Sequence, residues 1–255
     1  MKSLTYIIEI LKEKRKGNKN MFYMKLVEYV FQVENKYDYV SRLCKDYCIE
    51  QPETVDYVIS ISDQEIQREN QDGGNWPVEY LESLAVYRKI CEVLLEKDII
   101  LFHCSALEMN GKALLFTAAS GTGKSTHTRL WRERFKDQVT MVNDDKPLLV
   151  ITKDHVYVYG TPYGGKDGIQ TNTHAEVAGI FILHQAKENT LKKVPFKEAY
   201  PMLLNQTYRR KDASGMIQTM DTVSKLSIVP TYELGCTISY EAVDLVYQEI
   251  FGSNK

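Results

Sequence analysis

The stretch Ala118-Ala119-Ser120-Gly121-Thr122-Gly123-Lys124-Ser125-Thr126 has the spacing of a phosphate-binding loop, with alanine at position 118 where the motif usually has its first glycine. In such a loop, glycines let backbone N–H groups curl around phosphate oxygens, a lysine neutralises them, and a serine hydroxyl reaches Mg²⁺. We therefore expect a nucleotide site made by Ser120, Gly121, Thr122, Gly123, Lys124, Ser125 and Thr126.

The sequence on both sides of this stretch supports the same interpretation. The apolar run at 113–116 predicts a buried strand, and residues 125–135 have helical spacing, with His127 and Trp131 four positions apart. A strand, a glycine loop and a helix in this order direct the N-terminus of the helix at an anion. A flexible surface turn is the alternative, and this order disfavours it.

The Asn110-Gly111 dipeptide determines how the strand before the loop is paired. It separates two strand-like runs, 99–109 and 112–117, and predicts a hairpin with a type I′ turn. If Met109 pairs with Lys112, His103 lies opposite Ala118 at the mouth of the loop. The strand that leads into the loop then has an antiparallel neighbour, whereas P-loop folds of the GTPase kind use parallel crossovers there. We expect an α/β fold with a mixed, partly antiparallel P-loop sheet flanked by helices.

Composition limits the classes of partner. The chain has 255 residues and a net charge of −2, so no bulk electrostatic attraction to nucleic acid or anionic membranes is indicated. No apolar run approaches the roughly 18 residues of a membrane span, and charges interrupt the apolar N-terminal stretch, which disfavours a signal peptide. Five cysteines, an odd number, suggest reduced thiols in a cytoplasmic protein, and Cys44 and Cys48 lack a second Cys/His pair for zinc.

Two domains are expected along the chain. Residues 71–75 read Gln-Asp-Gly-Gly-Asn, which is typical of a linker, so we predict a small N-terminal α/β domain over 1–75 and a P-loop kinase-like domain over 76–255. The first domain is predicted to contain a helix at 3–14, one strand or a bent pair over 22–33, a helix near 38–48 and a strand at 56–62. The second is predicted to begin with a helix at 77–97.

Asp144 and Asp145 follow a predicted strand at 139–142, about twenty residues beyond Lys124. In phosphoryl transfer one carboxylate holds Mg²⁺ while a second can accept the proton of an attacking hydroxyl. We expect Ser125 and Asp145 as metal ligands and both aspartates as catalytic residues, and the sequence leaves open which aspartate takes which role. A solvated turn or a helix cap is the alternative for an isolated Asp-Asp pair.

Other polar residues join this candidate site by position. The hairpin register brings His103 next to the phosphates, where it could bond the catalytic aspartate, although a packed strand histidine is equally compatible with the pattern. Lys166 lies in the glycine-rich segment 160–168 and is expected to contact substrate or the γ-phosphate. Arg209 and Arg210 suit either an internal arginine finger or a solvated turn.

Taken together, these residues resemble the nucleotide-binding core of the HPr kinase and phosphoenolpyruvate carboxykinase superfamily. The resemblance rests on Phe102-His103-Cys104-Ser105, on the loop at 120–126, on Asn143-Asp144-Asp145-Lys146-Pro147 and on Gly160-Thr161-Pro162. It is closest to small bacterial HPr-kinase-like proteins and covers about 77–210. It implies an ATP- and Mg²⁺-dependent kinase in which His103 supports the catalytic aspartate. The chain has no match to the HPr kinase segment associated with phosphorolysis, nor to the arginine-rich oxaloacetate site of the carboxykinases.

The function expected from these features is transfer of the ATP γ-phosphoryl group to a hydroxyl of a small molecule or of a serine in a peptide or protein. Two alternatives stay open: a regulatory ATP-binding module without phosphotransfer, and carboxykinase activity on oxaloacetate. Residues 1–75 carry no motif that assigns them to peptide recognition, to closure over a metabolite or to contacts within a homo-oligomer.

Overall fold

The computed structural model describes residues 20–71 and 73–252. The chain divides into two compact units, Met1–Ile90 and Cys91–Lys255, each of which is described by itself. The division falls within helix α4 (Val78–Leu94), so the domain boundary expected between 75 and 76 stays a prediction. The helix expected at 3–14 lies outside the described residues.

The first unit contains a four-stranded sheet in the order β3-β1-β2-β4. β1 and β2 form an antiparallel hairpin, which confirms the bent pair expected over 22–33. The strand expected at 56–62 is shorter, because Ser62 caps α3 in a capping box with Glu65. Its elements are β1 (Asn20–Leu26), β2 (Tyr29–Asn35), α2 (Asp38–Leu43), a 3-10 turn η1 (Lys45–Tyr47), β3 (Cys48–Ile49), β4 (Tyr57–Ser60), α3 (Asp63–Arg68) and the start of α4.

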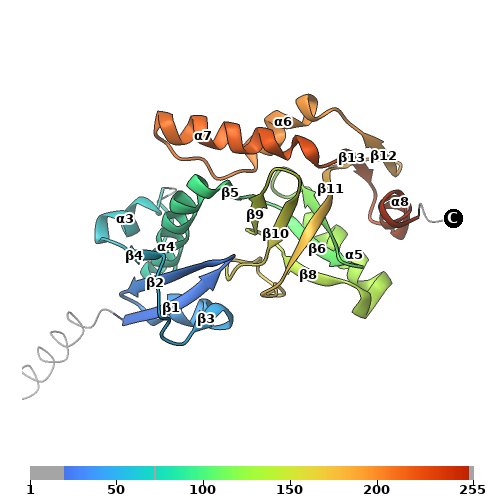
Figure 1. Cartoon of the computed structure of the whole chain (residues 1–255). Coiled ribbons are helices and arrows are strands. Elements are labelled where there is room, and N and C mark those ends of the chain that lie inside the picture. The colour runs from blue at the N-terminus through green and yellow to red at the C-terminus, as the bar shows by residue number, and fades with distance from the viewer. Residues whose placement is uncertain (1–19, 72, 253–255) are drawn as a thin grey trace, which may run out of the picture. The chain divides into compact units, whose positions relative to one another are not determined.

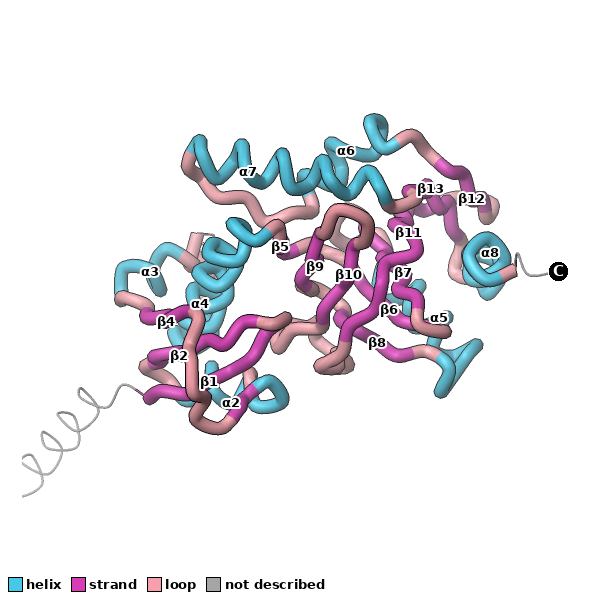
Figure 2. The backbone as a smooth tube through the Cα atoms, viewed as in Figure 1, coloured by secondary structure: helices cyan, strands magenta, loops and turns pink. Residues whose placement is uncertain are grey.

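The second unit is built on a nine-stranded mixed sheet (Figures 1 and 2). Seven strands follow the order β5-β9-β10-β11-β7-β6-β8, while β13 pairs with β11 and β12. The strands are β5 (Ile99–Leu101), β6 (Ser105–Met109), β7 (Lys112–Thr117), β8 (Thr140–Asn143), β9 (Leu148–Ile151), β10 (Val156–Tyr159), β11 (His174–Gln185), β12 (Thr190–Lys193) and β13 (Thr231–Cys236). β11 is parallel to both β7 and β13, and the other pairs are antiparallel.

Alternating residues of β7 point into separate hydrophobic cores. Leu114 and Phe116 pack with Trp131 of α5 and with α8, whereas Ala113 and Leu115 pack with α6 and α7. Helices therefore flank both faces of this sheet, as the sequence predicted. The helices and 3-10 turns of this unit are the end of α4 from Cys91 on, η2 (Leu95–Lys97), α5 (Lys124–Phe135), η3 (Lys136–Gln138), α6 (Phe196–Asn205), α7 (Ala213–Ser224), η4 (Lys225–Ile228) and α8 (Tyr240–Phe251). Across the described ranges we find no helix of the length and apolar character needed to cross a bilayer.

The hairpin between β6 and β7 has the predicted register. Met109 pairs with Lys112 and Ser105 with Phe116. Asn110 and Gly111 have φ values of 53° and 77°, the left-handed pair that a type I′ turn requires.

The run at 99–109, however, is not the single strand that was expected. The first part, β5, ends at Leu101 and pairs with β9, and β6 begins only at Ser105. Between them the backbone N–H of His103 donates to the carbonyl of Gln206 (2.7 Å), and the His103 carbonyl accepts from Thr117 Oγ1 (3.0 Å). His103 therefore lies beside the end of β7, held by contacts other than the predicted ladder with Ala118.

Candidate active site

The backbone of the loop between β7 and α5 has the conformation that its glycines allow. Gly121 and Gly123 have φ values of 78° and 116°, and a Cβ at either position would meet no atom within 4 Å. Glycine is therefore favoured at both positions by the positive φ of the backbone, and not by a lack of room for a side chain. Gly123 is also the N-cap of α5, and its carbonyl accepts the N–H of His127 (2.9 Å).

The side chains of the loop have the chemistry and exposure that a nucleotide phosphate needs. Lys124 Nζ donates to the Ala118 carbonyl (3.2 Å), so the ammonium lies over the loop. Thr122 Oγ1 donates to the Ala119 carbonyl (2.8 Å), while Ser120 and Ser125 are exposed. A cationic lysine, glycines that permit close backbone approach and an exposed hydroxyl at the helix start fit a phosphate chain with Mg²⁺.

The sheet order brings the two aspartates to the same edge as this loop. β7 and β8 are each antiparallel to β6, which lies between them, so they run parallel to each other and their carboxyl ends meet at one edge. Since neighbouring strands are about 4.8 Å apart, the end of β8 lies roughly 10 Å from the end of β7. Asp144 and Asp145 follow directly after β8. Burial raises the pKa of the Cys104 thiol, and the charges of Lys124, Asp145 and Asp144 all lie close enough to act on it.

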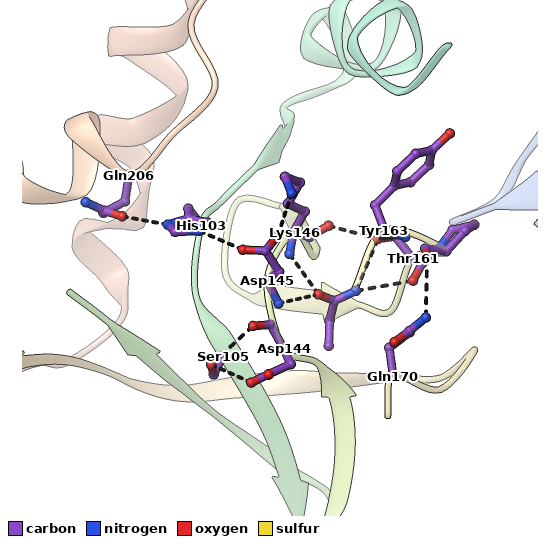
Figure 3. A network of polar contacts seen from close by, with 11 residues as sticks. His103, Ser105, Asp144, Asp145, Lys146, Thr161, Tyr163, Gln170 and Gln206 are labelled. Carbon is purple, nitrogen blue, oxygen red and sulfur yellow. Dashed lines mark hydrogen bonds and ion pairs between the residues drawn. The ribbon is translucent and has the colours of Figure 1, made fainter. Parts of the chain in front are cut away.

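Asp145 is the centre of a polar network (Figure 3). Its Oδ1 lies 2.7 Å from His103 Nε2, and its Oδ2 accepts a hydrogen bond from Lys146 Nζ. The other ring nitrogen of His103, Nδ1, lies 3.1 Å from Gln206 Oε1. Burial acts to raise the pKa of Asp145, but the hydrogen bond from His103 and the charge of Lys146 outweigh it, so the pKa lies below its ordinary value.

Gln206 holds the His103 ring on the side opposite Asp145. The Oε1 atom of an amide only accepts, so His103 Nδ1 must be the donor in that hydrogen bond. The other ring nitrogen, Nε2, faces Asp145 Oδ1 at 2.7 Å. This network confirms by geometry the expected contact between His103 and an aspartate, and it identifies that aspartate as Asp145.

Asp144 has different surroundings. It is buried, and its Oδ1 accepts a hydrogen bond from Ser105 Oγ (2.7 Å). Gly165 lies against its other oxygen, because a Cβ on Gly165 would be 2.8 Å from Asp144 Oδ2. The glycine-rich segment 160–168 therefore packs directly on one of the two carboxylates.

Asn143 and Thr161 hold the turn that carries both aspartates. Asn143 Oδ1 accepts the backbone N–H groups of Asp145 and Lys146, both at 2.8 Å. Its Nδ2 donates to the carbonyl and the Oγ1 of Thr161, and Thr161 Oγ1 donates to the Lys146 carbonyl (2.8 Å). Both side chains are fully buried. This pair joins the aspartate turn to the glycine-rich segment.

Several of these residues were not singled out from the sequence as parts of the site. They are Ser105, Asn143, Thr161 and Gln206. A signal existed for Asn143, since an asparagine directly before a turn often bonds the backbone two residues on. No local pattern marks Gln206, which is 103 residues from His103 in the chain.

Lys166, Arg209 and Arg210 are the remaining candidates from the sequence, and none of the contacts of this network described above includes them. Lys166 is exposed and follows Gly165, the residue that contacts Asp144. Arg209 bonds Asn205 (3.1 Å), and Arg210 forms an ion pair with Asp212 (2.9 Å), the residue that caps α7. The two arginines therefore have partners of their own near the start of α7.

The other histidines and cysteines form no metal site in the described parts of the chain. We find there no group of three or more Cys, His, Asp or Glu side chains that could hold a metal ion. His127 Nε2 accepts the Trp131 indole N–H (3.1 Å), and burial lowers the pKa of His127 to about 4. His127 is therefore a neutral, packed side chain of α5. Cys48 Sγ donates a hydrogen bond to the Cys44 carbonyl (3.4 Å), and the two cysteines form no disulfide.

Comparisons with known proteins find likeness among solved structures only. No protein-family model matches the chain, and no curated protein matches it by sequence. Among solved structures it is similar to the Hpr(Ser) kinase/phosphatase from Coxiella burnetii, at 12% identity and a TM-score of 0.32. That alignment covers 57% of this chain and 90% of the other. A likeness of this size carries no argument about activity.

Proposed function

We propose that this protein is an ATP-dependent phosphotransferase that moves the γ-phosphoryl group to a hydroxyl. The observation that carries the proposal is the position of the aspartate turn (residues 143–146) relative to the glycine loop (residues 118–124). Both follow parallel strands that end at one edge of the sheet, with one strand between them. This arrangement supports phosphate binding on one side and carboxylate chemistry on the other.

Asp144 and Asp145 suit different roles in this proposal. Both oxygens of Asp145 already have partners, in His103 and Lys146, and the Lys146 ammonium disfavours a cation there. Asp144 has a hydroxyl donor on one oxygen and no basic side chain among the contacts described above. We therefore assign the metal to Ser125 and Asp144, in preference to the Ser125 and Asp145 pair expected from the sequence. Mg²⁺ held there would supply charge neutralisation for the phosphates.

Asp145 then orients the acceptor hydroxyl. In a loose phosphoryl-transfer transition state the nucleophile needs positioning more than early deprotonation, so a carboxylate with a lowered pKa is adequate. Its Oδ atoms accept the hydroxyl proton as a hydrogen bond, and His103 keeps the carboxylate in place. Lys124 and the loop amides bind the phosphates. Lys166, next to Gly165, is proposed to contact the transferred group or the acceptor.

Calorimetric binding of ATP with Mg²⁺, together with a phosphate-release assay, tests this function. Lys124→Ala should abolish binding, whereas Asp145→Asn should retain ATP binding and lose turnover. Arg210→Ala, outside the network, serves as the control. ATP binding without transfer to any hydroxyl acceptor, and with Asp145→Asn behaving as the parent protein, would favour a regulatory nucleotide-binding module. Formation of phosphoenolpyruvate from oxaloacetate would favour a carboxykinase.

A further inference from the structure

A cavity of about 380 Å³ lies next to the glycine loop, on the side away from the aspartates. Its walls come from three parts of the second unit: loop residues 121–123 with the first turns of α5, residues 185 and 186 after β11, and residues 236–238 after β13. Gln185 Nε2 donates to the Thr122 carbonyl (3.4 Å), which joins one wall to the loop. The volume is within the range of ligand pockets, about 300 to 1,000 Å³.

The sheet topology places this cavity in line with the loop and the aspartates. β8, β7, β11 and β13 all run in the same direction, and their carboxyl ends lie at one edge. The order along this edge is the aspartate turn after β8, the glycine loop after β7, and then the cavity after β11 and β13. Ligands of α/β proteins bind outside the carboxyl ends of such strands. An elongated ligand held at the loop can therefore extend to both sides of it.

The lining of the cavity suits an uncharged heterocycle and a sugar. Leu130, Ala186 and Ile238 supply apolar surface, while Thr126 and Thr237 supply hydroxyls. Within the described residues, the lining contains no Asp, Glu, Lys or Arg. Ile238 is 78% exposed, so it is an apolar side chain at the cavity with no packing role in the core. The cavity therefore offers, among the residues described, no cationic side chain to an anionic group other than the phosphates at the loop.

We propose that this cavity binds the base and ribose of the nucleoside triphosphate, so that the triphosphate crosses the loop from β13 towards β8. The proposal rests on the proposed function in taking a nucleotide as the ligand of the loop. It gives the substrate an orientation, with the terminal phosphate at the aspartate turn and the base at Ile238. It also assigns contacts with the base to Leu130, Ala186 and Ile238, which lie outside the phosphate loop.

Calorimetry with two probes, ATP and inorganic tripolyphosphate, each with Mg²⁺, separates the cavity from the loop. Tripolyphosphate has the phosphates and lacks the base, so ATP should bind more tightly to the parent protein. Ala186→Trp, which fills the cavity, should weaken ATP binding at least about tenfold, a change of roughly 1.4 kcal/mol. It should leave tripolyphosphate binding unchanged. Ile228→Trp, at a different cavity lined by Asp98 and Lys225, is the matched control.

A second readout does not depend on a substitution. Cys236 lines the cavity, and Cys48 in the other unit is exposed, so both can be alkylated in one reaction. Burial raises the pKa of Cys236, so the reaction is carried out at alkaline pH. ATP should slow alkylation of Cys236 and not of Cys48, and tripolyphosphate should protect neither.

The outcomes for this inference and for the proposed function differ. Equal affinity of the parent protein for ATP and tripolyphosphate, or equal weakening of both by Ala186→Trp, overturns the cavity assignment. Binding of neither probe overturns the cavity assignment and nucleotide binding together. A preference for ATP that Ala186→Trp removes, in a protein that transfers no phosphate, supports the cavity and overturns only the phosphotransferase proposal.

Discussion

Gly165→Ala is the substitution that most sharply tests the role of Asp144. A Cβ at this position would lie 2.8 Å from Asp144 Oδ2 and 3.4 Å from the Asp144 Cβ and Cγ. Ordinary contact begins at 3.4 Å, so the two groups must separate by 0.6 Å (3.4 minus 2.8). Asp144 cannot simply rotate away, because it is buried and its Oδ1 is held by Ser105 at 2.7 Å.

The expected effect of this substitution is on rate. A 1 Å displacement of a reacting group can cost about 100-fold, so a displacement of about 0.6 Å predicts a loss of roughly 10- to 100-fold in turnover. Gly165 has no positive φ, so alanine adds no backbone strain there, but crowding against the buried Asp144 should lower the free energy of unfolding by about 1 to 3 kcal/mol. The assay is phosphate release as a function of Mg²⁺ concentration, with thermal unfolding measured alongside.

Gly168→Ala is the matched control in the same loop. Gly168 has a φ of 59°, and a Cβ there would meet no atom within 4 Å. Alanine in that conformation costs about 1 to 2 kcal/mol of local strain but leaves Asp144 untouched. Unchanged turnover in Gly165→Ala, or an equal loss in both variants, would show that this loop does not act through Asp144.

Gly123, Asn143 and His127 offer three other tests in the same unit. Gly123→Ala, at a φ of 116° with open space around it, should cost about 1 to 3 kcal/mol of strain and weaken tripolyphosphate binding, which calorimetry measures. Asn143→Ala should leave the N–H groups of Asp145 and Lys146 without their acceptor, and it should lower the free energy of unfolding by about 2 to 4 kcal/mol in urea titrations, together with turnover. Burial lowers the pKa of His127 to about 4. The stability that the buried neutral imidazole contributes is therefore fully present above pH 6.5, the ordinary pKa of histidine, and is lost as the pH falls towards 4. Urea titrations should show a loss of roughly 3 kcal/mol over that range, and His127→Gln should remove this part of the pH dependence.

The features that could be predicted from the sequence are those with local signals. The glycine loop, the helix after it and the turn at Asn110-Gly111 each depend on residues that are neighbours in the chain. The hairpin register followed from the turn alone, because a two-residue turn fixes which residues face each other. The sheet order that brings Asp145 to His103 could be anticipated only in part, through that hairpin.

The contacts that could not be predicted join segments far apart in the chain. The break between β5 and β6 is invisible in an apolar run, because it arises from the pairing of β5 with β9 and the bond between His103 and Gln206. The separate surroundings of Asp144 and Asp145 depend on Ser105, Gly165 and Lys146, of which only Lys146 is a chain neighbour. Two adjacent aspartates are equivalent in a sequence, and only the folded chain distinguishes them.

If the glycine loop and the aspartate turn form one phosphotransfer site, as proposed, both must be intact for transfer. Transfer can be followed with γ-labelled ATP in the presence of a panel of hydroxyl acceptors, including serine peptides, sugars and inositols. We predict that the parent protein transfers label to an acceptor, and that Lys124→Ala and Asp145→Asn each abolish this transfer. Equal transfer by the parent protein and by both variants would show that the loop and the turn do not form one site.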